Sequence, residues 1–224
     1  MEFKRITIVC GHYGSGKTNV ALNIAYNLKA QGKKVSIADL DIVNPYFRTK
    51  DSVDELKAMG IELICSDYAG SNLDIPALPD RMYAITDDRS SNFVLDIGGD
   101  DRGALALGRL APAIIKENNY EMLAVINKYR PLTRDTDSTV EVLREIEFAG
   151  GIPFTAIVNN SNLGDDTDSN TVIDSLAYAK SISDIMKIPI AFTSYDERLS
   201  TELSGKIDNG FKLKMQKSLL KKEC

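Results

Sequence analysis

Seven short apolar runs, separated by segments with helical spacing, constrain the fold of this 224-residue chain more than any other feature. The runs are too uniformly apolar to leave one face in water, which is typical of strands buried on both faces of a parallel sheet. Their alternation with helices predicts an α/β fold: a doubly wound, mostly parallel sheet of about seven strands with helices on both faces. The expected strands cover residues 6–10, 34–40, 61–65, 93–97, 123–127, 154–159 and 188–192.

The segments between these strands carry apolar residues at intervals of three and four, the spacing of a helix with one buried face. Nothing along the chain reads as an internal repeat or a low-complexity linker, so we expect a single domain over residues 1–224. Two polar excursions interrupt the pattern. Residues 66–91 should hold one short helix, and residues 159–170 should form a loop at the exit of a strand.

The composition excludes several classes of protein. The chain has 27 basic and 32 acidic residues, a net charge of −5, whereas general nucleic-acid binders carry a basic excess. Its apolar runs are shorter than the ~18 residues that cross a bilayer, and its first residues do not resemble a signal peptide. Three widely spaced cysteines without a CxxC pair predict neither a disulfide framework nor a zinc or iron–sulfur site. We therefore expect a cytoplasmic protein that does not bind nucleic acid.

The motif GHYGSGKT fits the phosphate-loop pattern G-x-x-x-x-G-K-[ST] and directly follows the first predicted strand. Its glycines let the backbone curl, so that N–H groups converge on phosphate oxygens at the positive end of the following helix. Lys17 is then placed to reach the β- and γ-phosphates, and Thr18 to offer its hydroxyl to Mg²⁺. The residues expected to contact the nucleotide are Gly11, His12, Tyr13, Gly14, Ser15, Gly16, Lys17 and Thr18.

Carboxylates follow two of the other predicted strands. Asp96 lies at the end of the strand 93–97 and precedes Gly98 and Gly99, which suits a residue that holds Mg²⁺ near a γ-phosphate. A helix cap for the segment that begins near Asp101 explains Asp96 as well. The second site is DLDIVNPYFR at residues 39–48, where two aspartates leave the second strand.

Together these motifs resemble the MinD/ParA and CobQ/CobB group of P-loop ATPases, which belong to the SIMIBI class, over most of the chain. The resemblance implies the P-loop NTPase fold, with ATP and Mg²⁺ bound and ATP hydrolysed to ADP and phosphate. Asp41 matches the carboxylate that positions Mg²⁺ and the attacking water, with Asp39 as its neighbour. A turn-forming role for Asp41 is the alternative. The implied catalytic residues are Lys17 and Asp41, and the implied metal ligands are Thr18, Asp41 and Asp96.

In this group an asparagine after a late strand contacts the base, and the matching residue is Asn159, with Asn160 as the second choice. An amide suits an adenine edge because it both donates and accepts, although turn formation explains either asparagine equally well. Guanine would favour N-K-x-D, but residues 127–130 read NKYR. The missing carboxylate favours ATP over GTP.

The chain departs from the group at His12, where members that form nucleotide-sandwich dimers carry a lysine. A homodimer is therefore possible but lacks the support of a cross-dimer lysine. We expect a nucleotide-driven switch that acts on a protein partner. The alternatives are an ATP-dependent synthetase or kinase for a small acceptor, as in dethiobiotin synthetase and CobB, or a module that binds ATP without turnover.

Several weaker signals have competing explanations. Tyr46, Phe47 and Arg48 suit either a partner contact or packing against the sheet. Arg130 and Arg134 suit either an anion in the same crevice or plain surface charge.

The lysine-rich C-terminus is read as a docked terminal helix rather than a membrane anchor, because its apolar residues do not form one helical stripe. The stretch DDTDSN at 165–170 lacks the glycine and glutamate of a calcium loop and is expected to cap a helix.

Overall fold

The computed structural model describes residues 1–40, 53–65, 80–98 and 101–215. Within them the backbone forms one sheet of eight parallel strands, in the order β3-β2-β4-β1-β5-β6-β7-β8. The strands are β1 (Ile6–Cys10), β2 (Val35–Leu40), β3 (Glu62–Cys65), β4 (Asn92–Ile97), β5 (Tyr120–Ile126), β6 (Ala156–Asn159), β7 (Ile190–Asp196) and β8 (Gly210–Leu213). The predicted parallel sheet is confirmed, with one strand more than expected.

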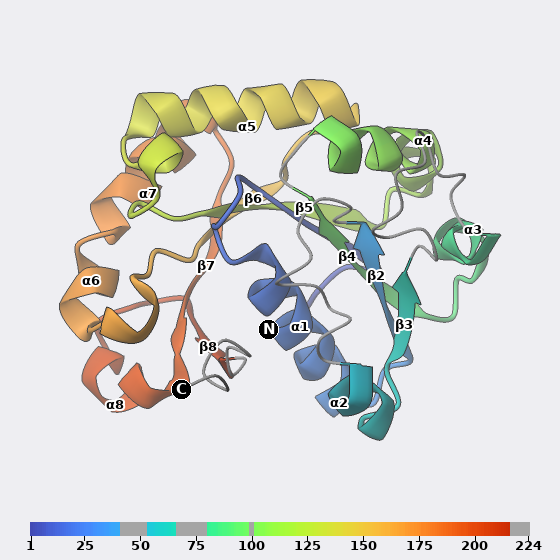
Figure 1. The fold of residues 1–224 in the computed structure, drawn as a ribbon, viewed down its shortest axis with the longest axis horizontal. Helices are drawn as coiled ribbons and strands as arrows, with labels where there is room; N and C mark the ends of the chain where they lie inside the picture. The colour runs from blue at the N-terminus through green and yellow to red at the C-terminus, as the bar shows by residue number, and fades with distance from the viewer. Residues whose placement is uncertain (41–52, 66–79, 99–100, 216–224) are drawn as a thin grey trace, which may run out of the picture.

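Helices cover both faces of the sheet, as predicted (Figure 1). On one face, apolar side chains of α3, α4, α5 and α7 pack against the strands. On the other face, α1 and α2 complete a second core. The helices are α1 (Lys17–Ala30), α2 (Val53–Ala58), α3 (Asp80–Asp87), α4 (Asp101–Glu117), α5 (Thr136–Gly150), α6 (Ser169–Ile173), α7 (Leu176–Met186) and α8 (Ser200–Leu203).

The strand order places β1 at the centre, where the chain reverses its direction across the sheet. From β1 the chain crosses to β2 and β3 on one side, returns to β4 beside β1, and continues to β5 on the other side. In open α/β sheets, ligands bind outside the carboxyl ends of the strands at such a switch point. The loop that leaves β1 at this point is GHYGSG, the first part of the phosphate-loop motif.

The eighth strand corrects our expectation of a terminal helix that begins near residue 211. Phe211 and Leu213 are buried and Lys212 between them is exposed, which is the two-residue alternation of a strand. Phe211 contacts Phe192 of β7 and Phe3, with ring centroids 4.7 Å and 6.1 Å apart. This aromatic cluster holds β8 against the edge of the sheet. Residues 216–224 lie outside the described residues.

Candidate functional site

The loop between β1 and α1 is shaped by close contacts at two of its glycines. A Cβ at Gly11 would lie 2.3 Å from the carbonyl oxygen of Val125, so the first strand and β5 leave room only for hydrogen there. Gly16 has φ +87°, and a Cβ there would lie 2.3 Å from Nδ2 of Asn160. Both contacts come from elements on the β5 and β6 side of the sheet. The curl of the loop is therefore fixed by its surroundings as well as by its own sequence.

Helix α1 begins with its first N–H groups open. Gly16 is the N-cap in a left-handed conformation and gives no side-chain cap, and the first turn has no acidic residue. The first four N–H groups of a helix have no partner within the helix, and together with the helix dipole they attract anions. Within the described residues, the helix start is thus suited to hold phosphate oxygens.

Thr18 and Asp96 meet at this helix start. The Thr18 hydroxyl donates a hydrogen bond of 2.6 Å to the Asp96 carboxylate, and Asp96 is fully buried. Asp39 on β2 is in register with Asp96 on β4, which places both carboxylates on the same side of the sheet. Because Thr18 gives its proton to Asp96, its lone pairs remain available to a cation. Hydroxyl and carboxylate oxygens are ligands that Mg²⁺ accepts, so the residues present fit this ion.

The side chains inside the loop are also arranged for an anion. Lys17 is buried, and its Nζ donates to the carbonyl oxygen of His12 at 3.3 Å. Ser15 is 1% exposed, and its hydroxyl has no hydrogen-bond partner among the described residues. The His12 ring stays local, with Nδ1 3.0 Å from the Tyr13 carbonyl oxygen, and Tyr13 points largely into solvent. A buried ammonium and a buried hydroxyl thus lie within the phosphate loop.

The two candidate base-contacting asparagines have different surroundings. Asn159 is fully buried, donates to the Ser175 hydroxyl at 2.8 Å and accepts from the Ser161 hydroxyl at 2.7 Å. Asn160 donates to the carbonyl oxygen of Ser15 at 2.7 Å and accepts from the Ser194 hydroxyl, also at 2.7 Å. Asn160 therefore contacts the phosphate loop directly, whereas the Asn159 side chain forms hydrogen bonds with Ser175 and Ser161 in the segment that follows it. A base contact by either residue stays a prediction.

Arg130 also contacts the phosphate loop. From the sequence, a role in the crevice is one of two explanations for this residue, and plain surface charge is the other. Its Nε donates to the carbonyl oxygen of Gly14 at 2.8 Å, across 116 residues of chain. The guanidinium lies beside Gly14, where a Cβ would meet Nε at 3.4 Å. Arg134, four residues later, is exposed, and its side chain makes no hydrogen bond of the kind that Arg130 makes within the described part of the chain. The two arginines of RPLTR are thus not equivalent.

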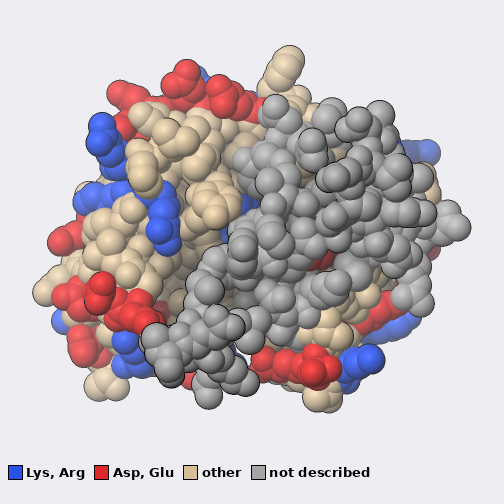
Figure 2. All heavy atoms as spheres, viewed as in Figure 1, with Lys and Arg blue, Asp and Glu red and all other residues tan. Residues whose placement is uncertain are grey.

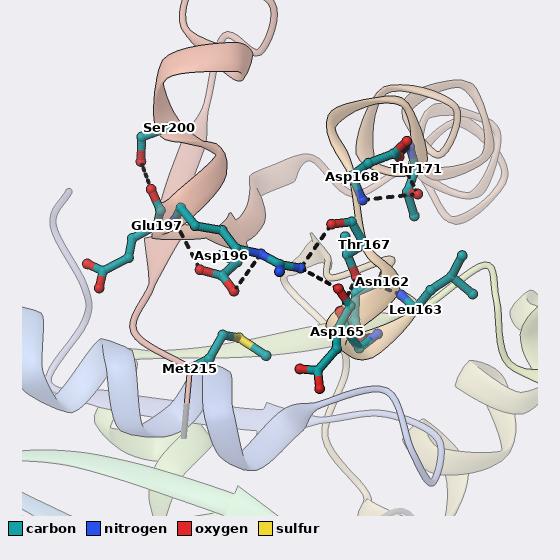
Figure 3. Close-up of polar contacts among 12 residues, drawn as sticks. Asn162, Leu163, Asp165, Thr167, Asp168, Thr171, Asp196, Glu197, Ser200 and Met215 are labelled. Atoms are coloured by element: carbon teal, nitrogen blue, oxygen red, sulfur yellow. Dashed lines mark hydrogen bonds and ion pairs between the residues drawn. The ribbon is translucent and has the colours of Figure 1, made fainter. Parts of the chain in front are cut away.

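The loop that follows Asn160 is held by hydrogen bonds among its own residues and from the short 3₁₀ helix η4 (Glu197–Leu199) that follows β7 (Figure 3). The carboxylate of Asp168 accepts from the backbone N–H and the hydroxyl of Thr171, which confirms the helix cap expected in this stretch. These bonds lower the pKa of Asp168 below its ordinary value. Arg198 donates to the carbonyl oxygens of Asp165 and Thr167 at 2.8 and 3.0 Å. The segment that carries Asn160 is therefore anchored at both ends.

Five residues named in the sequence analysis fall outside the described residues: Asp41, Tyr46, Phe47, Arg48 and Gly99. Strand β2 ends at Leu40, whose register partner is Ile97 at the end of β4. The roles assigned to Asp41 stay predictions.

A comparison with protein families matches residues 6–167 to the model described as CobQ/CobB/MinD/ParA nucleotide binding domain. The match covers most of the chain and includes the phosphate loop, Asp96 and both asparagines. The resemblance read from the motifs is confirmed. No curated protein matches the sequence.

Solved structures with a similar fold bind different nucleotides. FtsY from Mycoplasma mycoides has a TM-score of 0.57 and 18% identity over 88% of this chain and 63% of its own. FtsY from Elizabethkingia anophelis in complex with GDP has a TM-score of 0.54 and 14% identity over 97% of this chain and 62% of its own. A nucleotide-binding protein from Archaeoglobus fulgidus in complex with ADP has a TM-score of 0.51 and 16% identity over 88% of this chain and 84% of its own. The chain spans about three fifths of the FtsY receptors, so these likenesses establish the fold.

The described helices include none that is both long and apolar enough to cross a bilayer.

Proposed function

Because the chain belongs to the CobQ/CobB/MinD/ParA family of nucleotide-binding domains, we propose that it is a Mg²⁺-dependent ATPase whose nucleotide state acts on a protein partner. The observation that carries this proposal is the hydrogen bond between Thr18 and Asp96 at the open N-terminus of α1. It joins a phosphate-binding helix start to a buried carboxylate, the combination that Mg²⁺-dependent phosphoryl transfer needs.

The choice of ATP over GTP rests on the residues at 127–130. A guanine edge presents N–H donors, which a carboxylate would accept. The corresponding position is Arg130, a side chain with five donors and no acceptor, and its Nε is on the Gly14 carbonyl. The Asn127 amide oxygen is used by the backbone N–H groups of Tyr129 and Asn162. Residues 127–130, all of them described, thus offer no carboxylate to guanine, which supports adenine.

In the proposed reaction the protein positions phosphates and stabilises charge, with little covalent chemistry of its own. The loop N–H groups and Lys17 hold the β- and γ-phosphates and stabilise the charge that develops on the bridging oxygen. Thr18 and Asp96 hold Mg²⁺, which when bound neutralises phosphate charge. Asp41 orients the water that attacks the γ-phosphorus as ADP leaves.

The first test is Mg²⁺-dependent phosphate release from ATP and from GTP, together with thermal stabilisation by each nucleotide. Lys17→Ala provides the blank and should lower kcat/KM by roughly 10²–10³-fold. A variant of Asp41, Asp41→Ala, should abolish turnover while leaving nucleotide-dependent stabilisation in place. Lack of stabilisation by any nucleotide would contradict the assignment of the loop.

The same measurements separate the alternatives. Turnover of ATP by the protein alone supports the switch. Stabilisation by ATP without turnover indicates a missing partner or acceptor, and turnover that appears only with a small carboxylate or amine acceptor would identify a synthetase or kinase. Preference for GTP in both measurements would contradict the adenine assignment.

A further inference from the structure

A surface groove lies between α5 and α7, on the face of the sheet opposite α1. Its apolar lining consists of Val140, Phe148 and Ile185. Phe148 is 92% exposed, more than any other large apolar side chain among the described residues, and Ile185 is 45% exposed. An aromatic ring left in water beside a groove is typical of the anchor positions in protein interfaces.

Acidic side chains follow the rim of this groove. Asp137, Glu141 and Glu145 are exposed and recur every four residues along α5. Figure 2 shows acidic side chains gathered along the upper edge of the molecule, over α5. Among the described residues that line the groove, Arg144 is the one cation, so these residues carry a net charge of −2. Within the described part of the chain, none of the three carboxylates forms an ion pair.

The groove is connected to the phosphate loop by hydrogen bonds. Tyr178 of α7 donates to the carbonyl oxygen of Thr133 at 2.6 Å and lies 2.8 Å from the Thr139 hydroxyl of α5. Thr133 belongs to the short 3₁₀ helix η2 (Pro131–Thr133), which directly follows Arg130. Arg130 in turn holds the carbonyl of Gly14. Helices α5 and α7, which form the two walls of the groove, are thus hydrogen-bonded to each other and, through Thr133, to the segment whose Arg130 contacts the phosphate loop.

We propose that the groove between α5 and α7 docks a short, basic amphipathic helix of a partner protein. Charge complementarity selects this occupant, because carboxylates four residues apart lie about 6 Å apart along the axis of α5. Lysine or arginine side chains at the same spacing on a helix laid beside α5 pair with them, while its apolar face covers Phe148 and Ile185. The proposal rests on the proposed function in one respect: it names the class of partner on which the switch acts.

The test uses a fluorescent peptide of about 18 residues, built from leucine, alanine and lysine, with lysines at every fourth position beside a leucine face. A peptide of the same composition in scrambled order has no such face and serves as the first control. Binding to the whole protein is followed by fluorescence anisotropy, with ADP or a non-hydrolysable ATP analogue. Oligomeric state is measured in parallel by light scattering.

The groove variants are Phe148→Ser and the double charge reversal Glu141→Lys with Glu145→Lys. Each should weaken peptide binding at least tenfold, and wild-type binding should fall as salt rises. Matched controls are Tyr83→Ser, an exposed aromatic on α3, and the double reversal Glu202→Lys with Asp208→Lys. These controls should bind the peptide like the wild type.

Equal binding of the scrambled peptide, or equal loss in the control variants, would overturn the proposal. A change from dimer to monomer in Phe148→Ser would assign the groove to a second copy of this chain and overturn it as well. All groove variants should retain basal phosphate release, since none touches the phosphate loop. Specific peptide binding without thermal stabilisation by any nucleotide would leave the groove assigned and contradict the proposed nucleotide site instead.

Discussion

At the scale of single residues, the phosphate loop is held from outside by two polar side chains. Asn160 contacts the carbonyl oxygen of Ser15, and Arg130 contacts that of Gly14. Both side chains hold a backbone carbonyl group of the loop. Each therefore influences the direction of the N–H group in the same peptide plane.

Replacing Arg130 should weaken nucleotide binding more than it slows the chemical step. Arg130→Ala removes a charge-assisted hydrogen bond worth about 1.5–3 kcal/mol, so the KM for nucleotide should rise at least tenfold while kcat changes less. Steady-state phosphate release measures both constants. Arg134→Ala, from the same segment, should behave like the wild type. An unchanged KM in Arg130→Ala would show that the loop keeps its shape without this contact.

Gly16 and Gly32 allow a comparison between backbone strain and steric conflict. Both have positive φ, +87° and +79°, but a Cβ at Gly32 meets nothing within 4 Å. Gly32→Ala should therefore cost about 1 kcal/mol of stability and leave nucleotide-dependent stabilisation intact. Gly16→Ala should lose that stabilisation, because its Cβ collides with the Asn160 amide. Thermal melts with and without nucleotide compare the two, and equal behaviour would exclude the collision as the cause.

The sequence predicted a site from the loop residues, Asp96 and the two asparagines, but not the different hydrogen bonds that the two asparagines form. The glycine pattern and Lys17 are read from adjacent positions, whereas the contact of Arg130 with Gly14 joins residues 116 positions apart. Charge and spacing alone gave Arg130 and Arg134 the same explanation. The turn that begins at the buried Asn127 separates them in space, and that turn depends on hydrogen bonds to Asn162 and Ser161, which join residues 35 and 33 positions apart in the sequence.

At the scale of helices and strands, Tyr178 joins α7 to η2 and α5 through one phenol group. Tyr178→Phe should lower the free energy of unfolding by about 1–3 kcal/mol, because the Thr133 carbonyl loses a buried partner. Urea denaturation near neutral pH measures the loss. Tyr83→Phe, on an exposed tyrosine, should leave stability unchanged. A neutral effect of Tyr178→Phe would show that apolar packing alone holds these elements together.

The same residue predicts a dependence on alkaline pH. Burial raises the pKa of Tyr178 to about 12, whereas an unfolded tyrosine titrates near pH 10. The folded state thus retains a proton that the unfolded state loses, so this contribution is complete below about pH 10 and is lost as pH rises from about 10 to 12. Unfolding measured at about pH 9 and about pH 11 should show a steeper loss for the wild type than for Tyr178→Phe. Parallel losses would contradict the shift.

The type of element could be predicted where the apolar pattern extended over a long segment. The prediction failed where the segment was short. The seven expected strands are present, and the helix expected near Asp101 begins there. The strand at Gly210–Leu213 was missed because a four-residue segment that contains Lys212 and precedes Lys214 fits the end of a lysine-rich helix as well as a strand. Its identity depends on packing against Phe3 and Phe192, which lie far away in sequence.

At the scale of the whole molecule, Arg5 joins the start of β1 to distant parts of one sheet face. It pairs with Glu117 at the end of α4 and donates to the carbonyl oxygens of Ile85 and Asp88 at 2.8 and 2.9 Å. The hydrogen bond from Arg5 holds the pKa of Glu117 below its ordinary value, against the effect of burial. The order of strands that brings these residues together is not encoded in any single segment.

Removing this ion pair should make the protein less stable and less sensitive to acid. Because the folded pKa of Glu117 is lowered, its contribution is present above the unfolded value of about 4.3 and is lost as pH falls through the folded value. Glu117→Gln should cost about 1–3 kcal/mol at neutral pH and flatten the acid limb of the stability curve. Asp184→Asn, which breaks an exposed ion pair with Lys180, should change stability little. An acid limb identical to the wild type in Glu117→Gln would contradict the assignment.

The contact between Gly16 and Asn160 has a consequence for how this sequence can diverge. The space that hydrogen occupies at position 16 is bounded by the amide at position 160, so a larger residue at the first position needs a smaller one at the second. In an alignment of relatives the two columns should therefore co-vary, with a side chain at 16 tolerated only where 160 has lost its amide. Positions 16 and 160, which are separated by most of the chain's length, are thus expected to change together in evolution.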